Sequence, residues 1–180
     1  MFYYTIDNDN NIAQYTEIKG NTIPAFLKIW NKTERKIVTT LDGKFMFADD
    51  VDQSKEQELM IRNAKSDKIY ELKSKRDSLE VEPIEYNGNL FDFDEKARDR
   101  INSALIALDL MCENATIEWT TANNTNVTVT ANDLRTVIAN VAIRSNELHV
   151  KYRNLKERVE KCNTKEELDS IKWGDVSQTE

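Results

Sequence analysis

The chain contains few of the residues on which catalytic and metal sites depend. It has one histidine, His149, two cysteines that lie 50 positions apart, and four dispersed glycines. Zinc sites need several closely spaced nitrogen or sulfur ligands, so this composition excludes a zinc site of the usual spacing. Scattered glycines exclude a glycine-rich phosphate loop, and no Gly-x-Ser-x-Gly elbow occurs. The sequence therefore predicts no catalytic residue, no cofactor and no metal, and we expect that the protein is not an enzyme.

Long apolar runs are also missing. No stretch approaches the roughly 20 apolar residues that span a bilayer, and Met1–Ile6 lacks the basic region and apolar core of a signal peptide. We therefore expect a soluble protein with no membrane partner, made and kept in a bacterial cytoplasm or assembled there into a larger particle. Cys112 and Cys162 fall at apolar positions of predicted helices. They are expected to be reduced core thiols, with a disulfide or metal site as the alternative.

Acidic residues outnumber basic residues in the chain, 32 to 25. The net charge is −7 and the sequence pI is near 5.0, so the surface repels phosphate backbones. Direct nucleic-acid binding is therefore disfavoured, although an acidic protein can occupy the nucleic-acid groove of another protein. Charged residues make up 32% of the chain and hydrophobic residues 39%, a balance that suits long, solvated helices.

Residues 1–51 are expected to form a small antiparallel sheet of about four strands. Aromatic and β-branched residues alternate in Phe2–Ile6 and Ile12–Ile18, on either side of the polar turn 7–11. A second pair, Ile37–Leu41 and Lys44–Phe47, flanks Asp42-Gly43, a dipeptide that favours tight two-residue hairpin turns.

Residues 52–180 are expected to be mainly helical, so that the fold class is α+β. A helix follows Asp52, with Ser54-x-x-Gln57 as its capping box, and ends before Pro83. The hairpin around Asn87-Gly88 comes next, and then a helix capped by Asp94. A second hairpin joins 116–121 to Val127 and Val129, and a last short helix spans 165–171.

The strongest periodic segment is a helix that begins after Thr130. Its apolar positions are spaced alternately by four and three residues over about four heptads, as in the a/d seam of a coiled coil. They are Leu134, Ile138, Val141, Ser145, Leu148, Tyr152, Leu155, Val159 and Cys162, with Ser145 as the one polar break. The seam is too long for a small domain to cover evenly, so it needs a partner. Either the 52–79 helix or a second copy of the chain fills this role.

Clusters of polar residues have simpler explanations than chemistry. Asp7-x-Asp9-x-Asn11 resembles half of a calcium loop, but Ile12 and Ile18 replace the glycine and glutamate that such a loop requires. Asp49, Asp50 and Asp52 precede a helix and are expected to cap it, as are Asp92 and Asp94 at the next helix. Basic residues in 65–76 and 151–161 alternate with acidic ones. Pairs such as Glu71–Lys75 and Glu157–Lys161 explain them, and His149 is expected to face solvent beside the seam.

An ordered set of features in residues 73–173 resembles a domain of unknown function that is common near the C-termini of phage tail-fibre and tail-accessory proteins. These features are Lys75-Arg76-Asp77, Tyr86-Asn87-Gly88 with Phe91-Asp92-Phe93-Asp94, the Arg98 to Leu108 helix, Trp119 to Asn124 with Val127 to Thr130, Asn132-Asp133-Leu134, His149, and Thr164 to Leu168 with Ile171-Lys172-Trp173. The resemblance implies a phage or prophage origin, a location in the host cytoplasm or the virion, and a role in protein contacts. Trp119 and Trp173 are expected to be structural anchors, since both can bury a large apolar area.

Two functions from different classes fit these observations. The first is a tail-associated structural or accessory protein, whose N-terminal sheet docks to one partner and whose long helix contacts a fibre or another copy of the chain. The second is a phage-encoded inhibitor of a host defence nuclease, of the anti-CRISPR type, whose carboxylates stand in for phosphates. Both require a protein partner, and the first allows a homo-oligomer.

Overall fold

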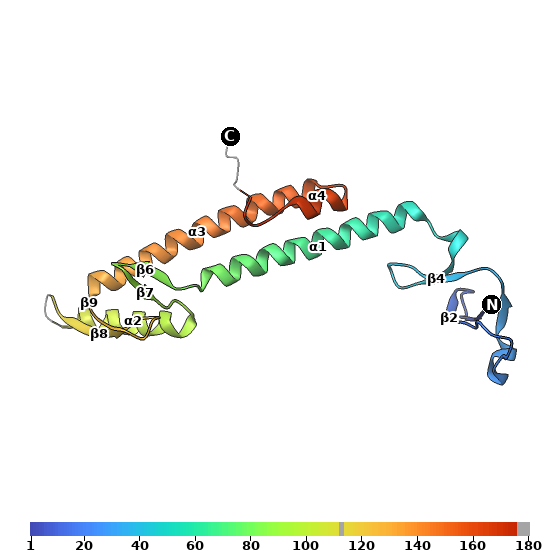
Figure 1. Cartoon of the computed structure of the whole chain (residues 1–180), viewed down its shortest axis with the longest axis horizontal. Helices are drawn as coiled ribbons and strands as arrows, with labels where there is room; N and C mark the ends of the chain where they lie inside the picture. Colours follow the sequence, from blue (N-terminus) through green and yellow to red (C-terminus); the bar gives the residue numbers. More distant parts are fainter. Residues whose placement is uncertain (112–113, 176–180) are drawn as a thin grey trace. The chain divides into compact units, whose positions relative to one another are not determined.

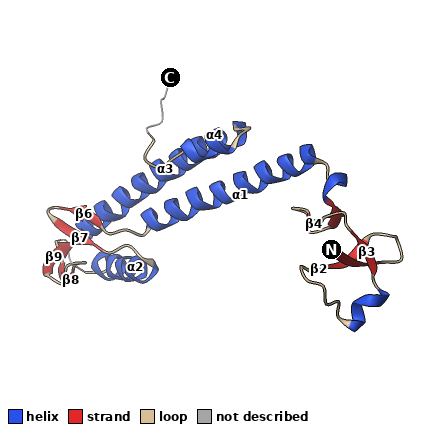
Figure 2. Ribbon diagram, turned by 45° about the vertical axis from the view of Figure 1, so that its right-hand side comes forward, coloured by secondary structure: helices blue, strands red, loops and turns tan. Residues whose placement is uncertain are grey.

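A computed structural model describes residues 1–111 and 114–175 of the chain. Within it the chain divides into two compact units, Met1–Lys65 (unit 1) and the residues from Ser66 onward (unit 2). Unit 1 is built on a β-sheet, whereas unit 2 consists of helices and two β-hairpins (Figures 1 and 2). The predicted α+β class is therefore confirmed. The boundary between the units lies inside helix α1 (Gln53–Glu80), whereas the sequence placed it before this helix, at residue 51.

The sheet of unit 1 has five strands, in the order β3-β1-β2-β5-β4, and all neighbours are antiparallel. The strands are β1 (Phe2–Ile6), β2 (Ile12–Glu17), β3 (Asn31–Thr33), β4 (Ile37–Thr39) and β5 (Phe45–Phe47). Two short 3₁₀ helices, η1 (Ala25–Ile29) and η2 (Ala48–Asp50), complete the unit. The expectation of four strands missed β3, because its sequence Asn-Lys-Thr is polar and pairs with a strand nearly thirty residues earlier.

Two hairpin turns of unit 1 share one geometry. The amide of Asp7 donates to the carbonyl of Asn11 at 2.9 Å, and the amide of Thr40 donates to that of Lys44 at 2.8 Å. In each three-residue loop one residue takes a positive φ, namely Asn10 at 63° and Gly43 at 83°. The Asp42-Gly43 hairpin therefore exists, but its loop has three residues instead of the predicted two, because only the glycine adopts the left-handed conformation.

Unit 2 packs its hairpins and helices around one apolar core. Its elements after α1 are β6 (Ile84–Tyr86), β7 (Asn89–Phe91), α2 (Glu95–Asp109), β8 (Thr116–Thr120), β9 (Asn126–Thr130), α3 (Ala131–Lys161) and α4 (Lys165–Ser170). The core consists of the buried residues Phe91, Ile101, Leu108, Trp119, Val129, Leu134 and Val137. Asn87 and Gly88 both have positive φ, as the predicted tight turn between β6 and β7 requires.

Most helix starts in the chain follow the expected capping chemistry. Asp94 accepts the amide of Ala97 at 2.7 Å, and both Thr130 and Thr164 head complete capping boxes. The start of α1 differs, because the carboxylate of Asp52 accepts the amides of Ser54 and Lys55. The predicted capping box at Ser54 is therefore wrong, and an acidic residue two positions earlier caps this helix.

Candidate interaction surfaces

The predicted a/d seam of α3, from here on the inner seam, faces the interior of unit 2. Leu134, Val141, Leu155 and Val159 are buried, while Ile138, Leu148 and Tyr152 are half-buried. At the start of the helix Val137 is buried more deeply than Ile138. The seam residues thus contribute to packing within the unit.

The end of α1 contacts the middle of α3 through Glu80. Ser145 Oγ donates to Glu80 Oε1 at 2.7 Å, and His149 Nε2 lies 2.9 Å from the same oxygen. Arg144 adds two bonds at the end of α1, to the carbonyls of Glu80 (3.0 Å) and Pro83 (3.2 Å). Cationic groups suit helix C-termini, whose last carbonyls lack partners within the helix.

These contacts explain the polar break in the seam. Ser145 takes the place of an apolar residue in the inner seam, and its hydroxyl donates to the carboxylate of Glu80. The two helices lie side by side in unit 2 (Figures 1 and 2), so α1 of the same chain serves as the partner along the middle of α3. His149 is about half exposed but pairs with Glu80, whereas the sequence predicted only contact with solvent.

The C-terminal part of α3 is covered by α4 and the residues after it. Leu168 and Ile171 are buried, and Trp173 is half-buried, with Lys151 Nζ 5.6 Å from the centre of its ring. Nearby on α3, the ring of Tyr152 lies 4.8 Å from the guanidinium of Arg76 on α1. Trp173 thus lies beside Lys151, one position before the seam residue Tyr152.

Trp119 lies in the core of unit 2, and the guanidinium of Arg100 is 4.7 Å from the centre of its ring. Cys162 is also buried, and its thiol donates to the carbonyl of Arg158 at 3.3 Å. Cys112, the other cysteine, lies outside the described residues. Trp119 and Cys162 thus belong to the packing and provide no exposed binding surface.

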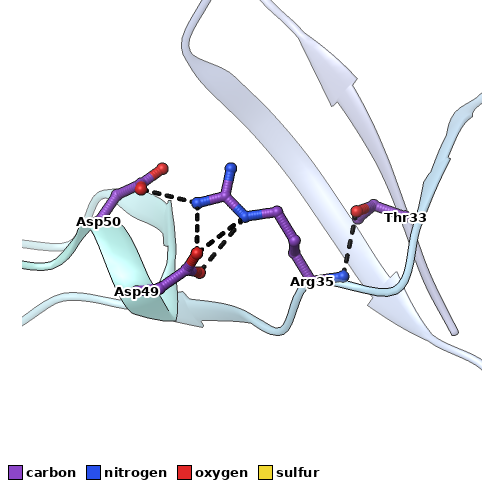
Figure 3. Close-up of polar contacts among 4 residues, drawn as sticks. All are labelled: Thr33, Arg35, Asp49 and Asp50. Atoms are coloured by element: carbon purple, nitrogen blue, oxygen red, sulfur yellow. Dashed lines mark hydrogen bonds and ion pairs between the residues drawn. The ribbon is translucent and has the colours of Figure 1, made fainter.

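In unit 1 the carboxylates before α1 form a clamp around Arg35 (Figure 3). Its Nη2 lies 2.8 Å from Asp49 Oδ2 and 2.6 Å from Asp50 Oδ1, and its guanidinium stacks 4.0 Å from the centre of the Phe47 ring. The hydrogen bond from Arg35 lowers the pKa of Asp49. Asp49 and Asp50 thus fix the loop before β4 against η2, and only Asp52 caps α1, which corrects the expectation that all three cap the helix.

The remaining polar clusters also have structural roles. The carboxylate of Asp7 accepts the amides of Asp9 and Asn11, both at 2.9 Å, and the bond from Asn11 lowers the pKa of Asp7. On α1, Glu71 forms its ion pair with Lys68 at 2.7 Å instead of with Lys75. Within residues 1–111 and 114–175, no three His, Cys, Asp or Glu side chains are grouped so that they can hold a metal ion.

A different kind of surface is found on η1. Leu27 is 1% exposed and anchors this 3₁₀ helix, whereas its neighbours Phe26 and Ile29 are 63% and 89% exposed. The rings of Phe26 and Trp30 meet edge to face, with centres 6.3 Å apart. We refer to Phe26, Ile29 and Trp30 as the apolar tip. Sequence analysis did not predict this exposed surface, because an apolar run normally indicates core.

The fold and these contacts define a two-unit α+β protein in which the polar contacts described above serve packing, capping and turns. The DUF4376 domain, a domain of unknown function, matches residues 63–172. This match covers 110 of the 180 residues, so the chain belongs to the DUF4376 family. Neither a curated protein nor a solved structure matches the chain. No helix in the described part of the chain is long and apolar enough to cross a membrane.

Proposed function

We propose that the protein is a non-catalytic phage or prophage protein that acts through protein contacts, as a structural or accessory component associated with the tail fibre. The similarity of residues 73–173 to a domain of tail-fibre and tail-accessory proteins supports this proposal. So does the division into two units, since it separates a small sheet that can dock to a partner from the helical unit of the DUF4376 family.

The observation that carries the proposal is the apolar tip. Two large apolar side chains, Phe26 and Ile29, are exposed to solvent next to the buried residue Leu27. Covering each of them contributes about 1.5–3 kcal/mol, and aromatic residues of this kind often dominate the energetics of interfaces. An exposed apolar projection of this size supplies a useful share of a binding free energy.

The surroundings of the tip indicate the chemistry of its partner. Lys28 lies within η1 and Lys32 lies on the edge strand β3, and both are exposed. A complementary surface therefore has an apolar groove for Phe26 and Ile29 and acidic residues at its rim. Because the wider protein is acidic, this local basic character favours one orientation of docking.

Co-purification tests the proposal directly. The tagged chain is co-expressed with the tail proteins of the phage or prophage from which it is proposed to come, and the Phe26→Ser/Ile29→Ser double variant is compared with the unchanged protein. We expect the unchanged protein to retain a tail component and the double variant to lose it. Leu110→Ser, which alters an exposed apolar residue of unit 2, is the matched control and is expected to retain the component. If no tail component is retained, or if the double variant retains it equally well, the proposal is wrong.

The second candidate, an inhibitor of a host defence nuclease, is favoured by one specific observation. Unit 2 contains 22 acidic and 16 basic residues, a net charge of −6, so most of the negative charge of the chain resides there. A protein of this charge is attracted to the basic nucleic-acid channel of a nuclease. A complex with a host nuclease that persists at moderate salt, in place of a tail complex, would support this candidate.

A further inference from the structure

Helix α3 has a second apolar stripe on the side that faces away from the core. Ala139, Ile143, Asn146 and Val150 are all exposed, with Ile143 at 59% and Val150 at 36%. Their spacing of four, three and four residues places Ile143 and Val150 at a positions and the other two at d positions of a heptad. We refer to these four residues as the outer seam.

Charge is scarce along the outer seam. Between residues 139 and 150 the only acidic or basic residues apart from His149 are Arg144 and Glu147. Arg144 turns toward the end of α1, where it donates to the carbonyls of Glu80 and Pro83. The exposed surface of this stretch is therefore nearly uncharged in a chain of which 32% is charged.

We propose that the outer seam is the contact surface for a second copy of this chain, with the two α3 helices packed antiparallel about a two-fold axis. The seam is self-complementary in this arrangement. Ile143 of each chain packs beside Asn146 of the other, and Ala139 packs beside Val150. Because the two-fold axis repeats each a–d pair, both chains bury the same four residues in the contact.

The charges beyond the seam select the antiparallel orientation. The heptad continues to Arg153 and Glu157 in one direction and to Thr136 and Asn132 in the other. A parallel, in-register pair sets Arg153 against Arg153 and Glu157 against Glu157, which is unfavourable. The antiparallel pair sets Arg153 across from Thr136 and Glu157 across from Asn132, so neither of these two charges faces its own copy.

The length of the seam determines how strong the dimer is. From Ala139 to Val150 the contact runs about 16 Å along the helix, which is short compared with standard interfaces. Asn146, the polar member of the seam, further lowers the affinity. The dimer is therefore reversible, with a dissociation constant of about 10–100 µM.

Sedimentation velocity of the full chain, below and above this concentration range, tests the proposal. We expect the unchanged protein to pass from monomer to dimer and the Ile143→Lys/Val150→Lys variant to remain monomeric, with unchanged helix content by circular dichroism. Tyr70→Lys, at an exposed position of α1, is the control and is expected to dimerise normally. A protein that stays monomeric throughout, a trimer, or a variant that still dimerises would overturn the proposal.

Cysteine cross-linking tests the orientation. In a Cys112→Ser/Cys162→Ala background, chains with Ala139→Cys are mixed with chains with Val150→Cys and then oxidised. The antiparallel arrangement predicts disulfides between the two kinds of chain and few within either kind alone. Efficient self-cross-linking of each kind indicates a parallel pair and contradicts the proposal. The outcome does not depend on the tail association, since the outer seam and the apolar tip lie in different units.

Discussion

Replacing Leu134 by alanine tests the account of the core of unit 2. Leu134 is 0% exposed and lies in the cluster that includes Ile101, Leu108 and Val137. Burial of a leucine side chain contributes about 1.5–3 kcal/mol, and the cavity left by Leu→Ala adds to the loss when the surroundings do not collapse. Because helices and hairpins surround this position, we expect little collapse and a loss of about 3–5 kcal/mol in the free energy of unfolding.

Urea denaturation followed by circular dichroism at the helical band measures this loss. Leu110→Ala is the matched control, since it removes the same atoms from a side chain that is 84% exposed. The control is expected to change the free energy of unfolding by less than about 0.5 kcal/mol. If Leu134→Ala loses less than about 1 kcal/mol, or no more than Leu110→Ala, then Leu134 does not lie in a packed core and the reasoning fails.

Three further predictions concern polar contacts. Arg144→Met is expected to cost about 1–3 kcal/mol in urea denaturation, because the carbonyl of Glu80 at the end of α1 loses its donor. Thr130→Ala is expected to cost about 1 kcal/mol, because the capping box of α3 loses its hydroxyl. Hydrogen bonds from Lys44 and from the Thr40 hydroxyl lower the pKa of Asp42 to about 2, which carboxyl NMR titration measures. A lowered pKa in the folded state means that Asp42 stabilises the fold above about pH 4 and that this contribution disappears as the pH falls toward 2.

Each of these predictions has a control and a contradicting outcome. Arg153→Met, at an exposed position of α3, is expected to be neutral, and an equal loss from it would show that Arg144 has no special role. Thr128→Ala, at an exposed position of β9, is also expected to be neutral. A loss from it equal to that of Thr130→Ala would show that the capping hydroxyl of Thr130 has no special role. Lys44→Met is expected to move the pKa of Asp42 back toward 3.8, and an unmoved pKa would contradict the assigned cause.

Signals that are local in sequence predicted local structure well. The cap at Asp94 and the Asn87-Gly88 turn each depend on residues only a few positions apart, and both are present in the structure. Predictions that depend on distant partners were weaker. Strand β3 has no apolar pattern of its own and exists because it pairs with β1, nearly thirty positions earlier. The Ser54 capping box was a local prediction that failed, because Asp52 accepts the first amides of α1 instead.

The partner of the inner seam shows the same limit. The heptad spacing indicated that α3 needs a neighbour but could not choose between α1 and a second copy. The choice is visible only in specific contacts, such as the bond from Ser145 to Glu80 across 65 positions of the chain. The apolar tip was equally inaccessible, because burial of Leu27 and exposure of Ile29 follow from tertiary structure and not from hydropathy.

The position of the unit boundary inside α1 has a consequence for how such proteins diversify. The DUF4376 match begins at residue 63, and the compact helical unit begins at residue 66, so both begin partway along a continuous helix. A genetic exchange that brings a new N-terminal unit must therefore join two helices in phase. Each residue added or removed at the joint rotates one side about 100° relative to the other, whereas seven residues restore nearly the same face. Viable chimeras at this joint are thus expected to differ in helix length by whole turns or heptads.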